Sequence, residues 1–289
     1  PLFINGLAIT KMGAAMANHQ LGLLTDEQAN AIITACREIL DGKHHEDFPV
    51  DMIQGGAGTT TNMNANEVIA NRALELMGHH RGEYQFCSPN DHVNRSQSTN
   101  DAYPTAIHLG LYATNKKLVE HLQLLIASHK KKGEEFADVL KMGRTQLEDA
   151  VPMTLGQTFH GFASILEDEV RNLNFAADDF LTVNMGATAI GTGIAAEPGY
   201  AEKCVAALGE ITGWPVKLAE DLVGATSDTS GMVGFSAAMR RVCIKVNKIC
   251  NDLRIIASGP RCGLGEINLP AMQPGSSIMP GKVNPVIPE

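Results

Sequence analysis

Three long stretches of helical periodicity constrain the fold of this 289-residue chain more than any other feature. They run from about Asp101 to Lys131, from Met153 to about Val183, and from Gly231 to Ala257. In each stretch apolar residues recur at intervals of three and four, as expected for one buried face of a helix. With a rise of ~1.5 Å per residue, each helix would be on the order of 40 Å long. Helices of that length are typical of an extended bundle.

The third stretch has the most regular pattern. Its apolar positions alternate strictly between spacings of three and four, which is the pattern of a coiled-coil seam. The seam consists of Met232, Phe235, Met239, Val242, Val246, Ile249, Leu253 and Ile256. Such a seam needs partner helices along its whole length, so we expect several long helices to pack side by side.

Shorter patterns precede the long helices. Leu2–Gln20 has helical periodicity, and Thr25–Gln28 forms a capping box that begins a second helix ending near Asp41. A glycine–threonine loop is expected from Gln54 to Asn62, followed by a helix from Glu67 to Met77.

Alternating strand patterns are nearly absent, so the sequence predicts an all-α fold. We expect two domains, a small N-terminal helical domain over residues 1–99 and a central long-helix bundle over residues 100–289. Pro1 is not a translation start, so the first domain is expected to be incomplete at its start. The second is expected to be incomplete at its end, because the chain stops within or just after a loop.

Composition and charge narrow the functional classes. Hydrophobic residues make up 44% of the chain and charged residues 19%, which is enough to bury a core. The net charge of −9 argues against a nucleic-acid partner. No apolar run reaches the length of a membrane span and no signal peptide opens the chain, so we expect no membrane partner and a cytoplasmic location. The six cysteines form no CxxC pair, and we expect no metal site.

Four polar loops punctuate the helices, around Thr59, Ser98–Asn100, Thr145–Gln146 and Ser276. Each is rich in hydroxyl and amide groups. A Ser-Thr-Asn run before a helix is more often an N-cap than a ligand-binding element. If the four loops converged, however, they would supply neutral donors for a dicarboxylate. The residues alone leave both interpretations open.

The last loop, Gly275 to Glu289, combines two glycines, three prolines, two adjacent serines, a lysine and an asparagine. Glycines let a backbone approach a ligand closely, and a lysine supplies a compact positive charge, so the loop suits a small polyanion. The residue order does not fit a phosphate-binding P-loop. On composition alone, an ordinary Gly/Pro surface loop remains the alternative to an anion-binding loop.

The run GSSIMPGKVNP (Gly275–Pro285) resembles the mobile active-site loop of the aspartase/fumarase superfamily. The segments Gly58–Glu67, Ser98–Asp101 and Gly143–Thr145 resemble other blocks of that superfamily and occur in its order. Within the superfamily the aspartases are most similar, through Lys141–Leu147, Met185–Gly191 and Ala219–Asp228. Fumarases usually have histidine at the position where this chain, like some aspartases, has Gln146. Glu289 matches the family glutamate that pairs with that histidine.

The resemblance implies reversible elimination of ammonia from L-aspartate to give fumarate, with no cofactor. It assigns the role of base to Ser276. The hydroxyls of Thr59, Ser98, Thr99 and Ser277 would hold the β-carboxylate, Thr145, Lys282 and Asn284 would grip the α-carboxylate, and Asn100 with Gln146 would lie near the amino group. It also implies a homotetramer whose active sites take loops from three subunits. A class II fumarase and a non-catalytic helical assembly protein of the same fold are the alternatives.

Overall fold

The computed structural model describes residues 1–51, 53 and 55–289. It divides into two compact units, each built from two segments of the chain. The first unit comprises Pro1–Lys116 with Ala177–Gly231, and the second comprises Lys117–Ala176 with Met232–Glu289. The domain boundary expected near residue 99 stays a prediction.

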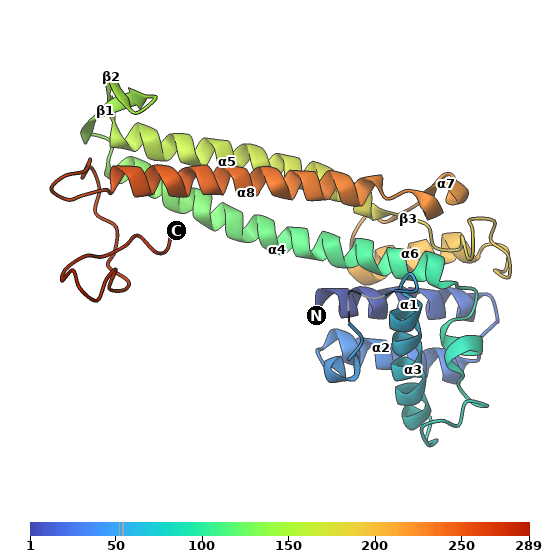
Figure 1. Cartoon of the computed structure of the whole chain (residues 1–289). Helices are drawn as coiled ribbons and strands as arrows, with labels where there is room; N and C mark the ends of the chain where they lie inside the picture. Colours follow the sequence, from blue (N-terminus) through green and yellow to red (C-terminus); the bar gives the residue numbers. More distant parts are fainter. Residues whose placement is uncertain (52, 54) are drawn as a thin grey trace. The chain divides into compact units, whose positions relative to one another are not determined.

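The fold is mostly helical, as predicted (Figure 1). The α-helices are α1 (Leu2–Gln20), α2 (Asp26–Leu40), α3 (Thr59–Leu76), α4 (Thr99–Glu135), α5 (Leu155–Ala177), α6 (Tyr200–Thr212), α7 (Leu222–Ser227) and α8 (Ser230–Ile256). Shorter helical turns are η1 (His45–Asp47), η2 (Pro89–Val93) and η3 (Asp178–Leu181). The strands are β1 (Leu140–Thr145), β2 (Glu148–Thr154), β3 (Thr182–Val183) and β4 (Lys217–Leu218).

Helix α1 forms over the predicted range, and the capping box before α2 is confirmed. The Thr25 hydroxyl accepts a hydrogen bond from the Gln28 amide at 3.2 Å, and the Gln28 side chain accepts one from the Thr25 amide at 3.3 Å. These reciprocal bonds satisfy two backbone donors that a helix start leaves unpaired.

The three long helices are also confirmed, as α4, α5 and α8. The predicted end of the second at Val183 was wrong, because α5 stops at Ala177 and a 3₁₀ turn follows. Thr182 and Val183 then pair in parallel with β4, so these residues use their backbone groups in a small sheet rather than a helix.

The second unit holds a bundle of long helices. Its part of α4 runs beside α5, with a Lys130–Glu167 ion pair at 2.5 Å, and α5 runs beside α8 (Figure 1). The Glu169 carboxylate of α5 is fully buried and pairs with Arg241 at 3.0 Å and Lys245 at 2.5 Å. Burial raises the pKa of Glu169, but these two cations outweigh that effect and the pKa falls below its ordinary value. An ionised carboxylate therefore fixes α8 against α5.

Half of the seam predicted on α8 is buried. Four of its residues, Phe235, Val242, Ile249 and Ile256, are in the core, whereas Met239 is 42% exposed. Outside the seam α8 also exposes apolar side chains, including Val233 at 66% and Ile244 at 58%. The helix therefore carries more apolar surface than this unit covers.

Two expectations about loops were wrong. Thr59 to Asn62 were assigned to a loop, but they form the first turn of α3, and Gln54 lies outside the described residues. A loop between helices was also expected around Thr145–Gln146, but β1 and β2 form an antiparallel hairpin there. Sequence periodicity missed the hairpin because β2 is exposed over most of its length, so it has no alternating apolar face.

The first unit packs α1, α2, α3 and α6 around apolar clusters. Alanine lines much of the packing face of α1, with Ala14, Ala15 and Ala17 almost fully buried. If Gly6 of α1 carried a Cβ, that atom would lie 2.2 Å from the Ala106 carbonyl oxygen of α4. The small residues therefore let neighbouring backbones approach closely, which fixes α1 against its neighbours.

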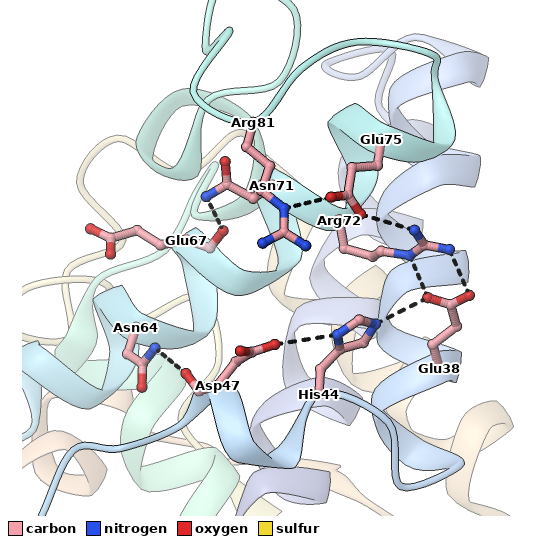
Figure 2. A network of polar contacts seen from close by, with 9 residues as sticks. All are labelled: Glu38, His44, Asp47, Asn64, Glu67, Asn71, Arg72, Glu75 and Arg81. Carbon is pink, nitrogen blue, oxygen red and sulfur yellow. Dashed lines mark hydrogen bonds and ion pairs between the residues drawn. The ribbon is translucent and has the colours of Figure 1, made fainter.

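An ion-pair network ties α2 to α3 at the surface of the first unit (Figure 2). Arg72 donates two hydrogen bonds to the Glu38 carboxylate, at 2.6 and 3.0 Å, and one to Glu75 at 2.9 Å. His44 lies between Glu38 and Asp47, at 3.4 and 3.3 Å. The bidentate bond from Arg72 lowers the pKa of Glu38 from 4.5 to about 2.

Replacing Glu38 with glutamine is expected to lower the free energy of unfolding by about 1–3 kcal/mol at neutral pH, because Arg72 loses a bidentate charged acceptor. The pKa of Glu38 is lower in the folded state. Its contribution to stability is therefore complete above pH 4.5 and is lost as the pH falls towards 2. Urea denaturation at several pH values measures both effects. Glu210→Gln, an exposed substitution on α6, is the control, and an equal loss in both variants would contradict the assignment.

Among the residues that the structure describes, no helix combines the length and apolar character that a membrane crossing requires.

Candidate functional site

In the first unit, two of the predicted site residues stand at helix starts. Thr59 is the first residue of α3 and Thr99 the first residue of α4. The backbone N–H groups of a first helical turn are unpaired within the helix, and the helix dipole places partial positive charge there. Both threonines therefore lie where a carboxylate would be stabilised.

Gly58 brings the start of α3 close to α4. Its φ of 83° is in the left-handed region, and a Cβ on it would lie 2.5 Å from the Tyr103 ring. Only glycine fits both the conformation and the space. Tyr103 belongs to the first turns of α4, so the two helix starts are neighbours within this unit.

Two linked amide side chains, one buried and one half-buried, fix Thr99. The Asn62 side chain donates to the Thr99 hydroxyl and to the Asn94 side-chain oxygen, both at 3.2 Å. The same Asn94 oxygen accepts a hydrogen bond from the Lys11 ammonium at 2.9 Å. Lys11 is fully buried, and burial lowers its pKa to about 7. The Thr99 hydroxyl therefore has a fixed partner on the side of the protein core.

Ser98 caps α4. Its hydroxyl accepts the Asn100 amide at 3.3 Å, and Asp101 accepts the Ser98 amide at 2.9 Å. Burial raises the pKa of Asp101 to about 6, against the effect of the backbone donors Ser98, Thr188 and Gly186. The N-cap role is thus realised, and it leaves the second lone pair of the Ser98 hydroxyl for another donor.

Asn100 is held by the glycine-rich segment that follows β3. Its side-chain nitrogen donates to the Ala189 carbonyl at 2.7 Å, and its own carbonyl accepts from Asn184 at 3.1 Å. With one donor hydrogen engaged, the amide orientation is fixed and its oxygen is an acceptor suited to an ammonium group.

In the second unit, Thr145 and Gln146 lie at the tip of the β1–β2 hairpin. Thr145 pairs with Glu148, so Gln146 and Leu147 form a two-residue turn. Both have positive φ, 53° and 67°, a combination that favours Asn-Gly. Two bulky residues in this conformation store strain, of order 1 kcal/mol each, which is a feature of functional loops.

The Ser276 loop closes on itself. Pro274 and Val283 form an antiparallel bridge, and the Gly275 amide donates to the Lys282 carbonyl at 2.8 Å. Inside this closure the Ser276 hydroxyl oxygen accepts the amides of Ile278 at 3.2 Å and Met279 at 3.3 Å. Two backbone donors on one hydroxyl oxygen stabilise negative charge there, as an oxyanion hole does.

Lys282 and Asn284 lie on the returning arm of the same loop. The Lys282 ammonium donates to the Gly275 carbonyl at 3.4 Å, next to Ser276. A Cβ on Gly275 would lie 2.5 Å from the Asn284 side-chain oxygen, so this glycine makes room for the amide. Ser277, which follows Ser276 in the loop, is exposed.

Lys282 and Asn284 also line a hollow in the second unit with a volume of about 780 Å³. The rest of its lining comes from the end of α8 and the segment after it, including Arg254, Ile267 and Asn268. Ser276 lies at a neighbouring hollow of about 490 Å³ lined by Gln273 and Pro280.

The predicted residues thus fall into two groups, one in each unit. Thr59, Ser98, Thr99 and Asn100 belong to the first unit, and Thr145, Gln146, Ser276, Ser277, Lys282 and Asn284 belong to the second. Within each group the structure gives the local geometry described above. In the part of the chain that the structure describes, no group of three His, Cys, Asp or Glu side chains is placed to hold a metal ion.

Comparison with known proteins places these features in one family. The model of a family described as lyase matches residues 3–289. The chain belongs to this lyase family. It is therefore a member of the aspartase/fumarase superfamily, as its signature loop predicts.

Several relatives of the lyase family share more than half of the residues of this chain. Aspartate ammonia-lyase from Pseudomonas aeruginosa is 59% identical over 290 residues, which cover 100% of this chain and 61% of the relative. The enzyme of the same name from Escherichia coli K12 is 55% identical with the same coverage. The chain thus spans about three fifths of the length of these relatives.

Solved structures of the family have the same fold. A fumarate lyase:delta crystallin from Brucella melitensis bound to cobalt matches with a TM-score of 0.97 and 54% identity, over 100% of this chain and 63% of that one. A class II fumarase from Schistosoma mansoni matches with a TM-score of 0.93 and 37% identity, over 100% and 64%.

Sequence reasoning missed the buried polar residues that support the predicted site residues without belonging to the predicted set. Lys11 lies within an apolar helix pattern, and its full burial against Asn94 has no sequence signal beyond a lone charge in that pattern. Asn62 and Asn66, four residues apart on α3, do form a polar stripe that periodicity could have shown. Glu266 lies in a segment of no regular structure, where no pattern marks its partners.

Proposed function

We propose that the protein is an aspartate ammonia-lyase, which reversibly eliminates ammonia from L-aspartate to give fumarate. The observation that carries the proposal is the Ser276 hydroxyl, held by two backbone amides in a loop that Lys282 closes. Relatives named aspartate ammonia-lyase, 54–59% identical over the whole chain, support the choice of substrate.

The first step is removal of a proton from Cβ of aspartate. This carbon is weakly acidic, so the base must be strong and the product anion must be stabilised at once. Ser276 as an alkoxide takes the proton. Serine is a poor base at its ordinary pKa, but the amides of Ile278 and Met279 stabilise the charge on its oxygen.

The electron pair left by the proton moves into the β-carboxylate, which becomes an enediolate. Thr59, Ser98, Thr99 and Ser277 are assigned to this group. The starts of α3 and α4 add the partial positive charge of their helix dipoles, which favours a dianionic group over a monoanionic one. This difference in binding is what lowers the barrier.

In the second step the C–N bond breaks and its electrons leave with nitrogen as neutral ammonia, while the enediolate electrons form the new C=C bond. An ammonium substrate needs no further proton to leave. The amides of Asn100 and Gln146 can orient the amino group but cannot protonate a leaving group. Loss of water requires an acid, so Gln146 favours loss of ammonia. Thr145, Lys282 and Asn284 hold the α-carboxylate.

The proposal includes a cytoplasmic homotetramer whose active sites each take loops from three subunits. The apolar side chains that α8 exposes, such as Val233 and Ile244, support a further helical partner along the bundle. No cofactor, membrane or nucleic acid takes part.

The full-length protein is expected to form fumarate from L-aspartate and none from L-malate, measured by fumarate absorbance with each substrate alone. Fumarate from malate alone would identify a class II fumarase instead. No turnover of either, in a protein that folds and assembles, would favour the non-catalytic assembly protein.

A further inference from the structure

A carboxylate outside the predicted site joins the β1–β2 hairpin to the segment that leads to the Ser276 loop. Glu266 follows α8, and its side chain is only 14% exposed. One carboxylate oxygen forms a short ion pair with the Arg144 guanidinium, and the other lies 3.1 Å from the Lys141 ammonium. Lys141 and Arg144 both belong to β1.

These two cations are about as buried as the carboxylate. The side chain of Lys141 is 10% exposed and that of Arg144 is 19% exposed. Burial raises the pKa of Glu266, but Arg144 and Lys141 outweigh it and the pKa lies below its ordinary value. Glu266 is thus ionised at neutral pH, and removing it leaves two cations with little water around them.

The hairpin has an irregularity that lets both cations reach Glu266. Between Met142 and Arg144 the register with β2 shifts, and Gly143 lies there with no room for a Cβ, which would be 2.9 Å from the Val151 carbonyl oxygen. In a regular strand, side chains three residues apart point to opposite faces. A bulge twists the strand locally, and here both Lys141 and Arg144 reach one carboxylate.

The backbone of Glu266 is fixed as well. Its amide donates to the Ile256 carbonyl at 2.8 Å, so the residue is tied to the last turn of α8. The carboxylate therefore connects the end of a long helix to β1. Its partner Arg144 lies one residue before Thr145 and two before the strained turn at Gln146.

We propose that Glu266 is a positioning residue, whose carboxylate holds Lys141 and Arg144 and so fixes the hairpin tip that carries Thr145 and Gln146. The effect on substrate rests on the proposed function. The effect on the hairpin does not, and the two can be measured separately.

The test compares Glu266→Gln with Glu167→Gln in the full-length protein. Glu167 forms an exposed ion pair with Lys130 in the same unit, so its loss controls for removing one carboxylate. Amide hydrogen exchange across β1 and β2 is expected to be about tenfold faster in Glu266→Gln, while α5 and α8 keep their protection. With aspartate, KM is expected to rise about tenfold and kcat/KM to fall about a hundredfold. The control should change neither.

Lys141→Gln breaks the same contact from the hairpin side and serves if Glu266→Gln does not fold. Its effect on exchange is expected to be smaller, because Arg144 still binds Glu266. In the double variant, Lys141→Gln should add little to the effect of Glu266→Gln, since both substitutions remove the same contact between Lys141 and Glu266. Unchanged hairpin exchange, or fully additive effects, would overturn the proposal. Absence of aspartate turnover in the wild type would instead overturn the proposed function and leave the exchange test standing.

Discussion

Ser276→Ala is expected to lower kcat for aspartate deamination on the order of 10³-fold or more, because it removes the group that takes the Cβ proton. The carboxylate donors remain, so aspartate binding should change little. Steady-state kinetics gives the rate, and calorimetry with the inactive variant gives the affinity.

Ser128→Ala is the matched control for this variant. Ser128 lies on α4, where its hydroxyl donates only to the Leu124 carbonyl one turn earlier, and the substitution should leave kcat unchanged. If Ser276→Ala kept a tenth of the wild-type rate, Ser276 would not be the base.

Lys282→Met is expected to raise KM roughly 10- to 100-fold and to lower kcat as well. The substitution keeps an unbranched side chain, one atom shorter, but removes the positive charge assigned to the α-carboxylate. It also removes the hydrogen bond to the Gly275 carbonyl, next to Ser276, which is why turnover should suffer with binding.

Lys131→Met, on the exposed face of α4, tests for a general effect of losing one lysine. It should leave both parameters near the wild-type values. An unchanged KM in Lys282→Met would show that the ammonium does not contact substrate.

Helices were the part of the fold that sequence could predict, because a helix is encoded by spacing within one segment. The capping box at Thr25 and the seam of α8 each depend on residues within a few turns of one another. The hairpin could not be predicted in the same way, since its Gln146–Leu147 turn has neither glycine nor asparagine.

The candidate site was predictable as a set of residues but not as an arrangement. The signature loop identified Ser276 and Lys282 by their order, yet the return of Lys282 to the Gly275 carbonyl follows the bridge between Pro274 and Val283, which the order of residues does not show. The partners of Thr99 and Arg144 lie 37 and 122 residues away in the sequence. Contacts at such separations leave no local pattern.

The turn at Gln146 and Leu147 has a consequence for anyone who tries to improve the protein by design. A procedure that scores each residue for turn propensity would replace this pair with Asn-Gly, and the hairpin would fold more readily. The same exchange would shorten by one methylene the amide side chain that is assigned to the substrate amino group, and so withdraw it from that group. Screens for thermal tolerance would therefore select such variants while discarding activity, and residues 145–147 are best held constant in any stabilisation library.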